Sequence, residues 1–180
     1  MSERETAGAY GLHVGTYEEG LTHIGRPSEV RFSELPVNEA MVRQFVSAVR
    51  DPNPLYWDQE LATQLCGSGV APPAMLTTWV TPQNWRPEYV PEPATALLVA
   101  VPLPGDSMIN ISSEIEFFDH LRIGDRLNVV EEVESISEEK QTRVGTGHYL
   151  TVVARFHRQS GELVAIQRNV ILRFWAQGAQ

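Results

Sequence analysis

The stretch VRDPNPLYWDQELATQL (residues 49–65), followed closely by GSGVAPPAMLTTWV (residues 67–80), is the most informative part of the sequence. Pro52 and Pro54 predict a rigid turn, because each proline fixes its own φ and moves the preceding residue away from helical geometry. Asp58 is a favourable N-cap for a short second helix, which the glycines of GSG end. We therefore expect a proline-fixed turn between two helices.

The residues before this turn predict a helix. NEAMVRQFVSAV (residues 38–49) offers Asn38 as an N-cap and repeats apolar residues at helical spacing. EVRF (residues 29–32) could form a first strand. Residues 1–27 are polar and rich in glycine, so we expect a loosely held N-terminal arm.

The residues after the turn predict another helix. Two prolines suit a helix start, and the apolar residues from Met75 to Val80 recur at helical spacing until Pro82 stops the pattern. From residue 95 the pattern changes to strands. Candidate strands are TALLVAV (95–101), MINISSEIEFF (108–118), DRLNVVEEVESI (125–136), TGHYLTVVARFHR (146–158) and ELVAIQRNVILRFW (162–175).

The order of helices first and strands afterwards predicts an α+β fold in which helices cover one face of an antiparallel sheet. Ser160-Gly161 suits a short hairpin turn, and GTGHY (residues 145–149) is read as the start of a strand rather than a phosphate loop. A chain of 180 residues suits one domain. The open sheet edges predict an oligomer.

Composition narrows the class of protein. Hydrophobic residues make up 42% of the chain, and 14 Lys and Arg against 23 Asp and Glu leave a net charge of −9, which argues against nucleic-acid binding. We find no signal peptide and no apolar run near the roughly 20 residues of a membrane span, so a cytoplasmic protein without membrane contact is expected. Cys66 alone excludes an internal disulfide, and no histidine pair has metal-ligand spacing, so no metal is predicted.

The motif VRDPNPLYWD with its following loop resembles the MaoC-like branch of the hot-dog fold, which includes (R)-specific enoyl-CoA hydratases and the dehydratase domains of fatty-acid synthases. EFFDHLRIGDRLNV (residues 116–129) is similar to a later strand and turn of that family, and residues 140–174 are similar to its last two strands. The resemblance implies a single hot-dog domain over residues 28–176. It also implies a long central helix wrapped by the sheet, and it leaves residues 177–180 as a tail.

The phrases APPAML and GELVA, together with the run K-x-T-x-x-G-x-G, look most like the larger hot-dog subunit of heteromeric enoyl-CoA hydratases that act on steroid side chains. In that branch the larger subunit pairs with a smaller one that carries the working Asp/His pair. The resemblance therefore implies a second hot-dog subunit as the partner, or a second copy of this chain. It implies an acyl-CoA thioester as substrate or ligand and no further cofactor.

Hydration of an enoyl thioester needs a base that activates water, an acid that protonates C2 and N–H donors for the enolate oxygen. The family motif supplies an Asp and a His five residues later. Here the Asp position is Asp51 and the His position is Tyr56, whose ordinary pKa near 10 makes it a poor base at pH 7. Asn53 and Pro54 match the motif and shape the turn. The simpler interpretation is that Asp51 only caps the turn and that Tyr56 is packed.

A second departure lies at the expected central helix, where family hydratases usually carry His-Gly and this chain carries Pro72-Pro73. Two prolines remove two N–H groups from a position where N–H donors are needed, so only Ala74 and later residues can donate. Both departures indicate a scaffold that lacks the full catalytic set.

Aromatic and long apolar side chains suit an acyl pocket, for which Trp57, Met75 and Trp79 are candidates, although ordinary core packing is the simpler interpretation. Arg122, Arg143 and Arg168 are candidates for a CoA phosphate.

Three hypotheses follow. The first is a non-catalytic or half-catalytic subunit of a heteromeric enoyl-CoA hydratase, inactive alone. The second is an active homodimeric hydratase that uses Asp51, and the third is an acyl-CoA-binding module without chemistry. A thioesterase is also compatible with the hot-dog fold, but the DPNP turn favours the hydratase branch.

Overall fold

The computed structural model describes residues 11–82, residue 87 and residues 96–176. Its helical elements are α1 (Tyr17–Leu21), α2 (Glu39–Val49), α3 (Gln59–Cys66), α4 (Leu97–Ala100) and the 3-10 turns η3 (Pro54–Tyr56), η4 (Pro73–Met75) and η5 (Thr77–Val80). Its strands are β1 (Arg31–Phe32), β2 (Val70–Ala71), β3 (Ser107–Phe117), β4 (Leu121–Arg122), β5 (Leu127–Ile136), β6 (Lys140–Gln141), β7 (Gly145–Arg158) and β8 (Leu163–Ala176). The predicted α+β class with an antiparallel sheet is confirmed.

The main sheet has the strand order β1-β5-β7-β8-β3, with β6 paired to β7 off this path. All of these pairs are antiparallel, and the predicted hairpin turn at Ser160-Gly161 joins the two longest strands. Gly147 lies where a Cβ would be 1.9 Å from the carbonyl oxygen of Arg173, so β7 and β8 approach each other closely there. GTGHY therefore opens a strand, as predicted.

The two helices around the proline turn form as predicted. The Asn38 side chain accepts from the Met41 N–H at the start of α2, and Asp58 caps α3 in the same way. Arg50 ends α2 in the left-handed conformation with φ 56°, and Gly67 does the same for α3. Left-handed terminal residues stop the helical hydrogen-bond ladder, so the chain is turned sharply on both sides of the motif.

The long helix expected between Pro72-Pro73 and Pro82 is wrong within the described residues, because this segment forms only the short turns η4 and η5. The two prolines remove N–H groups and Pro82 limits the length, so no full α-helical ladder develops. The strand expected over residues 95–101 is also wrong over its described part, which contains α4. Alanine and leucine dominate that helix, and both favour helical geometry.

Residues 11–27 are not a loose arm, contrary to expectation. Leu12 is fully buried, and α1 begins with a capping box in which Thr16 and Glu19 satisfy each other's N–H groups. Gly25 and Ser28 donate backbone hydrogen bonds to β5. Local capping and one buried leucine therefore hold the segment against the sheet. Residues 1–10 and the tail 177–180 lie outside the described residues.

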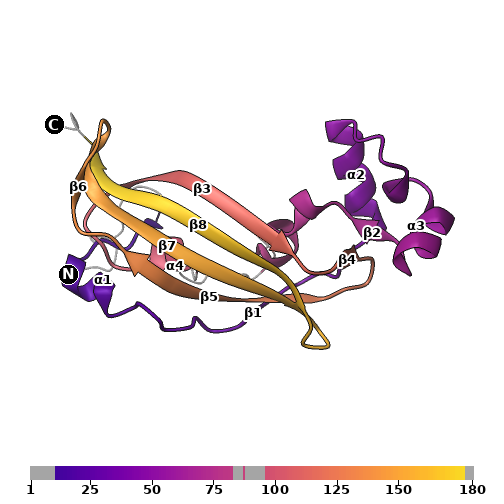
Figure 1. The fold of residues 1–180 in the computed structure, drawn as a ribbon, viewed down its shortest axis with the longest axis horizontal. Coiled ribbons are helices and arrows are strands. Elements are labelled where there is room, and N and C mark those ends of the chain that lie inside the picture. Colours follow the sequence, from indigo (N-terminus) through magenta and orange to yellow (C-terminus); the bar gives the residue numbers. More distant parts are fainter. Residues whose placement is uncertain (1–10, 83–86, 88–95, 177–180) are drawn as a thin grey trace.

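Figure 1 shows the elements α2, α3, β2 and β4 gathered beyond one end of the long curved sheet. The turn η3 contacts α2 and α3, and we call this whole part the helical end. The larger buried cluster packs α2, η4 and η5 against the near ends of β5, β7 and β8, whereas a second cluster lies under α4. β2 pairs with β4, with Ala71 opposite Leu121. This pairing joins the segment after the DPNP turn to the chain that follows β3.

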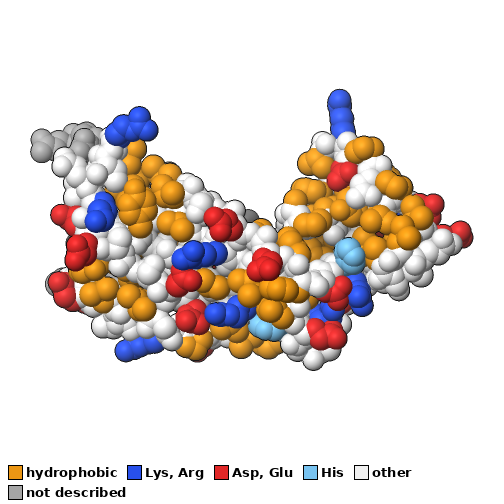
Figure 2. Space-filling view, viewed as in Figure 1, with side chains coloured by type: hydrophobic (Ala, Val, Ile, Leu, Met, Phe, Trp, Pro, Cys, Tyr) orange, Lys and Arg blue, Asp and Glu red, His pale blue; other side chains and the backbone are white. Residues whose placement is uncertain are grey.

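The space-filling view shows a hollow between the helical end and the opposite end of the sheet (Figure 2). In the same view β3 is the sheet strand that borders this hollow (Figure 1). β3 pairs only with β8, so its other edge has no strand partner among the described residues.

Candidate functional site

The carboxylate of Asp51 is used within the turn that carries it. Its Oδ1 accepts a hydrogen bond from the Asn53 N–H at 2.9 Å, and the Asn53 side chain in turn accepts from the Leu55 N–H. Pro54 then opens η3, while the Trp57 indole N–H donates to the Asp51 carbonyl oxygen at 2.8 Å. The turn-capping interpretation of Asp51 therefore has direct geometric support.

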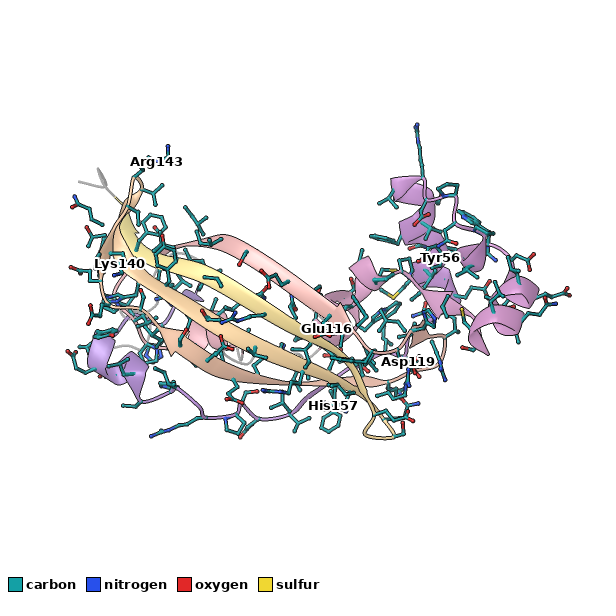
Figure 3. All side chains as sticks on the ribbon, viewed as in Figure 1. Tyr56, Glu116, Asp119, Lys140, Arg143 and His157 are labelled. Atoms are coloured by element: carbon teal, nitrogen blue, oxygen red, sulfur yellow. The ribbon has the colours of Figure 1, made fainter. Side chains whose placement is uncertain are left out.

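Tyr56 is half-buried and lies in the helical end (Figure 3). Its phenol is near enough to Asp51 for that charge to act on it. Burial raises the pKa of its phenol above the ordinary value of 10.0, and the charge of Asp51 raises it further, whereas the Asn53 side chain acts in the opposite direction. The phenol therefore stays protonated at neutral pH. It can donate a hydrogen bond, but it cannot take a proton from water.

The turn that begins at Pro72, directly after β2, offers few backbone N–H donors. Pro72 and Pro73 have no N–H, and the N–H groups of Met75 and Leu76 donate to the carbonyl oxygens of those two prolines at 3.0 Å. The exposed Ala74 carries the remaining N–H of this turn, and it has no acceptor among the described residues. The expected loss of donors at this position is thus seen in the geometry.

A cavity of about 240 Å³ lies beside this turn, and we call it the Pro73 pocket. Its lining consists of Ala71, Pro73, Phe117, Phe118, Asp119, His120 and Leu121. The pairing of β2 with β4 brings the two parts of this lining together. Five of the seven residues are apolar, so the two polar ones, Asp119 and His120, give the pocket its chemical character.

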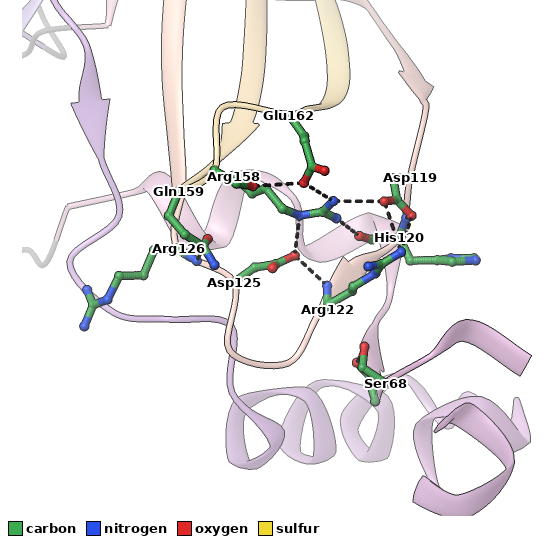
Figure 4. Close-up of polar contacts among 11 residues, drawn as sticks. Ser68, Asp119, His120, Arg122, Asp125, Arg126, Arg158, Gln159 and Glu162 are labelled. Atoms are coloured by element: carbon green, nitrogen blue, oxygen red, sulfur yellow. Dashed lines mark hydrogen bonds and ion pairs between the residues drawn. The ribbon is translucent and has the colours of Figure 1, made fainter. Parts of the chain in front are cut away.

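A buried guanidinium holds the polar wall of the pocket (Figure 4). Arg158, 7% exposed in its side chain, donates to Asp119 at 2.9 Å, to Asp125 at 3.3 Å and to Glu162 at 3.1 Å. The same guanidinium donates to the His120 carbonyl oxygen at 2.9 Å. The hydrogen bond from Arg158 is the main reason why the pKa of Asp119 lies below its usual range. Asp119 is therefore a fixed anion and a poor proton acceptor.

The acyl-pocket candidates do not share one cavity. Met75 and Trp79 are 2% and 3% exposed and belong to the larger core cluster. Trp79 also lines a second cavity, of about 390 Å³, with Leu35 and Met41 among its neighbours. Trp57 lies at the surface, where the Arg43 guanidinium stacks 5.1 Å from its ring centroid.

The three arginine candidates are far apart in the fold. Arg122 lies next to the Pro73 pocket and forms an ion pair with Asp119. Arg143 belongs to the hairpin tip at the opposite end of the sheet from Tyr56 (Figure 3). Arg168 pairs with Glu134 across the sheet. The structure therefore brings only Arg122 close to a cavity that contains site candidates.

Sequence reasoning missed Asp119, His120 and Arg158. The visible signal was FFDH (residues 117–120), in which two aromatic residues precede a carboxylate and an imidazole at a strand end. No group of three His, Cys, Asp or Glu side chains within the described residues could hold a metal ion. In the same part of the chain no helix is long and apolar enough to cross a membrane.

Residues 22–167 match the profile of a family described as "FAS1-like, dehydratase domain region". The chain therefore belongs to this family of MaoC-like hot-dog domains, and the resemblance inferred from the sequence is confirmed.

Two curated proteins are similar to this chain over most of its length. A protein of Thermomonospora curvata named "Probable enoyl-CoA hydratase alpha subunit" is 39% identical over 167 residues, which cover 88% of this chain and 52% of that protein. The "3-oxo-4,17-pregnadiene-20-carboxyl-CoA hydratase alpha subunit" of Mycobacterium tuberculosis is 27% identical over 141 residues, covering 76% of this chain and 45% of that protein. The chain thus spans about half the length of these relatives.

Solved structures agree on the fold. A chain of the ChsH1-ChsH2 complex from Mycobacterium tuberculosis superposes with a TM-score of 0.76 at 24% identity, covering 90% of this chain and 92% of that one. The (R)-hydratase PhaJ1 of Pseudomonas aeruginosa gives a TM-score of 0.55 at 18% identity, covering 84% and 82%. At these identities the likeness concerns the hot-dog fold alone.

Proposed function

We propose that this chain is the non-catalytic or half-catalytic hot-dog subunit of a heteromeric enoyl-CoA hydratase, and that it binds the acyl-CoA. The observation that carries the proposal is the protonated phenol of Tyr56 at the position where the family motif has histidine. Without an imidazole beside Asp51, the turn cannot prime a water molecule for addition to C3 of the enoyl thioester. Two curated relatives that are named alpha subunits of hydratases support this assignment.

The scarcity of N–H donors near Ala74 points in the same direction. Charge that develops on the thioester oxygen during hydration needs pre-placed donors, and removal of one donor commonly costs about 100-fold to 1000-fold in rate. Pro72 and Pro73 have no backbone N–H group and so cannot act as donors. The chain therefore supplies shape and binding surface, and a partner supplies the acid, the base and further donors.

The free edge of β3 is the surface that we assign to this partner, a second hot-dog subunit. β3 carries four exposed apolar side chains, those of Met108, Ile109, Ile111 and Ile115. Ile111 has the largest exposed fraction of the four, 51%. An exposed apolar edge strand offers both unpaired backbone groups and apolar area to another sheet. The hollow beside β3 gives such a domain room (Figure 2). The fold match to a chain of a two-protein complex supports this choice of partner.

Reconstitution tests the proposal. We expect the purified chain to hydrate crotonyl-CoA at the uncatalysed rate, and we expect co-expression with a small hot-dog protein carrying an intact D-x-N-P-x-H motif to yield an active complex. Hydration is followed by the loss of enoyl absorbance. Robust turnover by the lone chain would favour an active homodimer that uses Asp51. Acyl-CoA binding without turnover, even with the partner, would favour a binding module.

A further inference from the structure

His120 has a clamped backbone and an unused side chain. Its N–H donates to Asp119 Oδ1 at 2.7 Å, and its carbonyl oxygen accepts from Arg158 Nη2 at 2.9 Å. No described residue hydrogen-bonds the imidazole, which is exposed at the wall of the Pro73 pocket. A residue whose backbone is held on both sides presents its side chain at a defined place. The hydrogen bonds fix the backbone of His120, and its imidazole is free to bond a ligand.

The pocket suits a neutral segment of a ligand. Its volume of about 240 Å³ is below the roughly 300–1,000 Å³ of pockets that hold a whole drug-sized ligand. Asp119 in the wall is ion-paired with Arg158 and Arg122, so these charges are matched within the protein and a neutral ligand segment needs no counter-charge there. Phe117, Phe118 and Leu121 supply apolar contact.

We propose that the Pro73 pocket binds the pantetheine arm of an acyl-CoA thioester and that the imidazole of His120 hydrogen-bonds an amide of that arm. The inference rests on the proposed function, because it takes acyl-CoA as the ligand. A neutral imidazole has one donor and one acceptor nitrogen, and an amide has one N–H and one C=O. An alkyl chain in this place would bury the imidazole without a partner, which is unfavourable.

The direct test observes the histidine rings of this 180-residue chain by NMR during titration with hexanoyl-pantetheine, a neutral thioester without the nucleotide. We expect the ring resonances of His120 to move and those of His157 to stay, because His157 lies outside the pocket lining. Hexanoyl-CoA should move the same ring. A His120 ring that stays unchanged at saturating hexanoyl-pantetheine would overturn the proposal.

Variants give a second readout. His120→Ala should weaken hexanoyl-pantetheine binding by about fivefold to tenfold, the usual effect of losing one hydrogen bond. His120→Asn should retain most of the affinity, because its amide also donates and accepts, and His157→Ala is the matched control. Equal affinities for all three variants and the wild type would contradict the proposed role.

Failure of this subsite and failure of the proposed function are distinguishable. If the reconstituted complex hydrates crotonyl-CoA while the His120 ring remains unchanged, the subsite is wrong and the function stands. If hexanoyl-pantetheine moves the His120 ring while no complex turns over, the binding site stands and the hydratase assignment is wrong.

Discussion

At the scale of single residues, the decisive feature is a carboxylate and a phenol where the family motif has a carboxylate and an imidazole. One carboxylate oxygen of Asp51 accepts a hydrogen bond from the Asn53 N–H. Tyr56 keeps its proton because burial and the charge of Asp51 raise the pKa of the phenol. The pair can shape a turn and donate a hydrogen bond. The phenol cannot accept a proton from water at neutral pH.

Substitution of Asp51 separates the two roles of this residue. In the reconstituted complex we expect Asp51→Asn to change the hydration rate by less than about tenfold, because the amide oxygen can still accept from the Asn53 N–H. Asp51→Ala removes this cap and should lower the free energy of unfolding by about 1 kcal/mol. Kinetics and urea denaturation measure the two effects. A loss of several orders of magnitude in rate for Asp51→Asn would instead assign catalysis to this carboxylate.

At the scale of elements, the clamp formed by Arg158 ties the end of β7 to the chain between β3 and β5. Asp119 and Asp125 lie on that chain, and Glu162 lies on the hairpin that follows β7. The clamp orders residues 119–125, and with them the β2–β4 pair and the Pro73 pocket. A structural ion network therefore stands directly behind a candidate binding surface.

Loss of the clamp should be costly. We expect Arg158→Met to lower the free energy of unfolding by about 3–5 kcal/mol, because it leaves the buried Asp125 carboxylate without its cation. Arg168→Met is the matched control, and it should cost less than about 1 kcal/mol because its ion pair is exposed. Urea denaturation at pH 7 measures both. A loss of less than about 1 kcal/mol for Arg158→Met, as small as that expected for the control, would show that the clamp adds little stability.

The clamp also predicts an acid dependence. The pKa of Asp119 is lowered in the folded protein, so its stabilising contribution is present above the unfolded value of about 3.9 and is lost as the pH falls through the folded value. The difference in unfolding free energy between wild type and Arg158→Met should therefore shrink below about pH 4. A difference that stays constant from pH 7 to pH 3 would contradict this account.

At the scale of the whole molecule, the two edges of the sheet differ. One edge is covered, and the other, at β3, has no further strand partner among the described residues. β1 and the chain before it cover the β5 side, whereas β3 leaves its apolar side chains exposed beside the hollow (Figures 1 and 2). An open apolar edge of this length is unfavourable in an isolated protein, because it invites pairing with other chains. The exposed apolar side chains of β3 therefore favour pairing with another chain.

Interruption of the β3 edge should prevent that assembly. Ile111→Asp places a charge on the exposed edge, so we expect the folded chain to lose its partner in co-purification and to elute alone in size-exclusion chromatography. Val30→Asp is the matched control, since Val30 is 47% exposed at the other edge of the sheet. Circular dichroism checks that both variants fold. Retention of the partner by Ile111→Asp would place the interface elsewhere.

Local sequence patterns correctly predicted the α2 cap, the DPNP turn, α3 and the four long strands. Caps, prolines and period-2 alternation act over a few residues, so they can be read from the sequence. They failed at residues 74–81 and 97–100, where apolar residues fit more than one conformation and proline or tertiary packing decides. They also missed the docked segment 11–27, whose main anchor is the single buried leucine Leu12.

The amino-acid sequence by itself established the family, the missing histidine at Tyr56 and the missing N–H groups at Pro72 and Pro73, because these are matters of residue identity. Only the tertiary structure revealed the Pro73 pocket, since its walls come from segments more than forty residues apart that meet through the β2–β4 pair. The clamp on His120 likewise depends on a guanidinium from a distant strand. Contacts between distant segments are set by packing and strand register, which local sequence patterns do not encode.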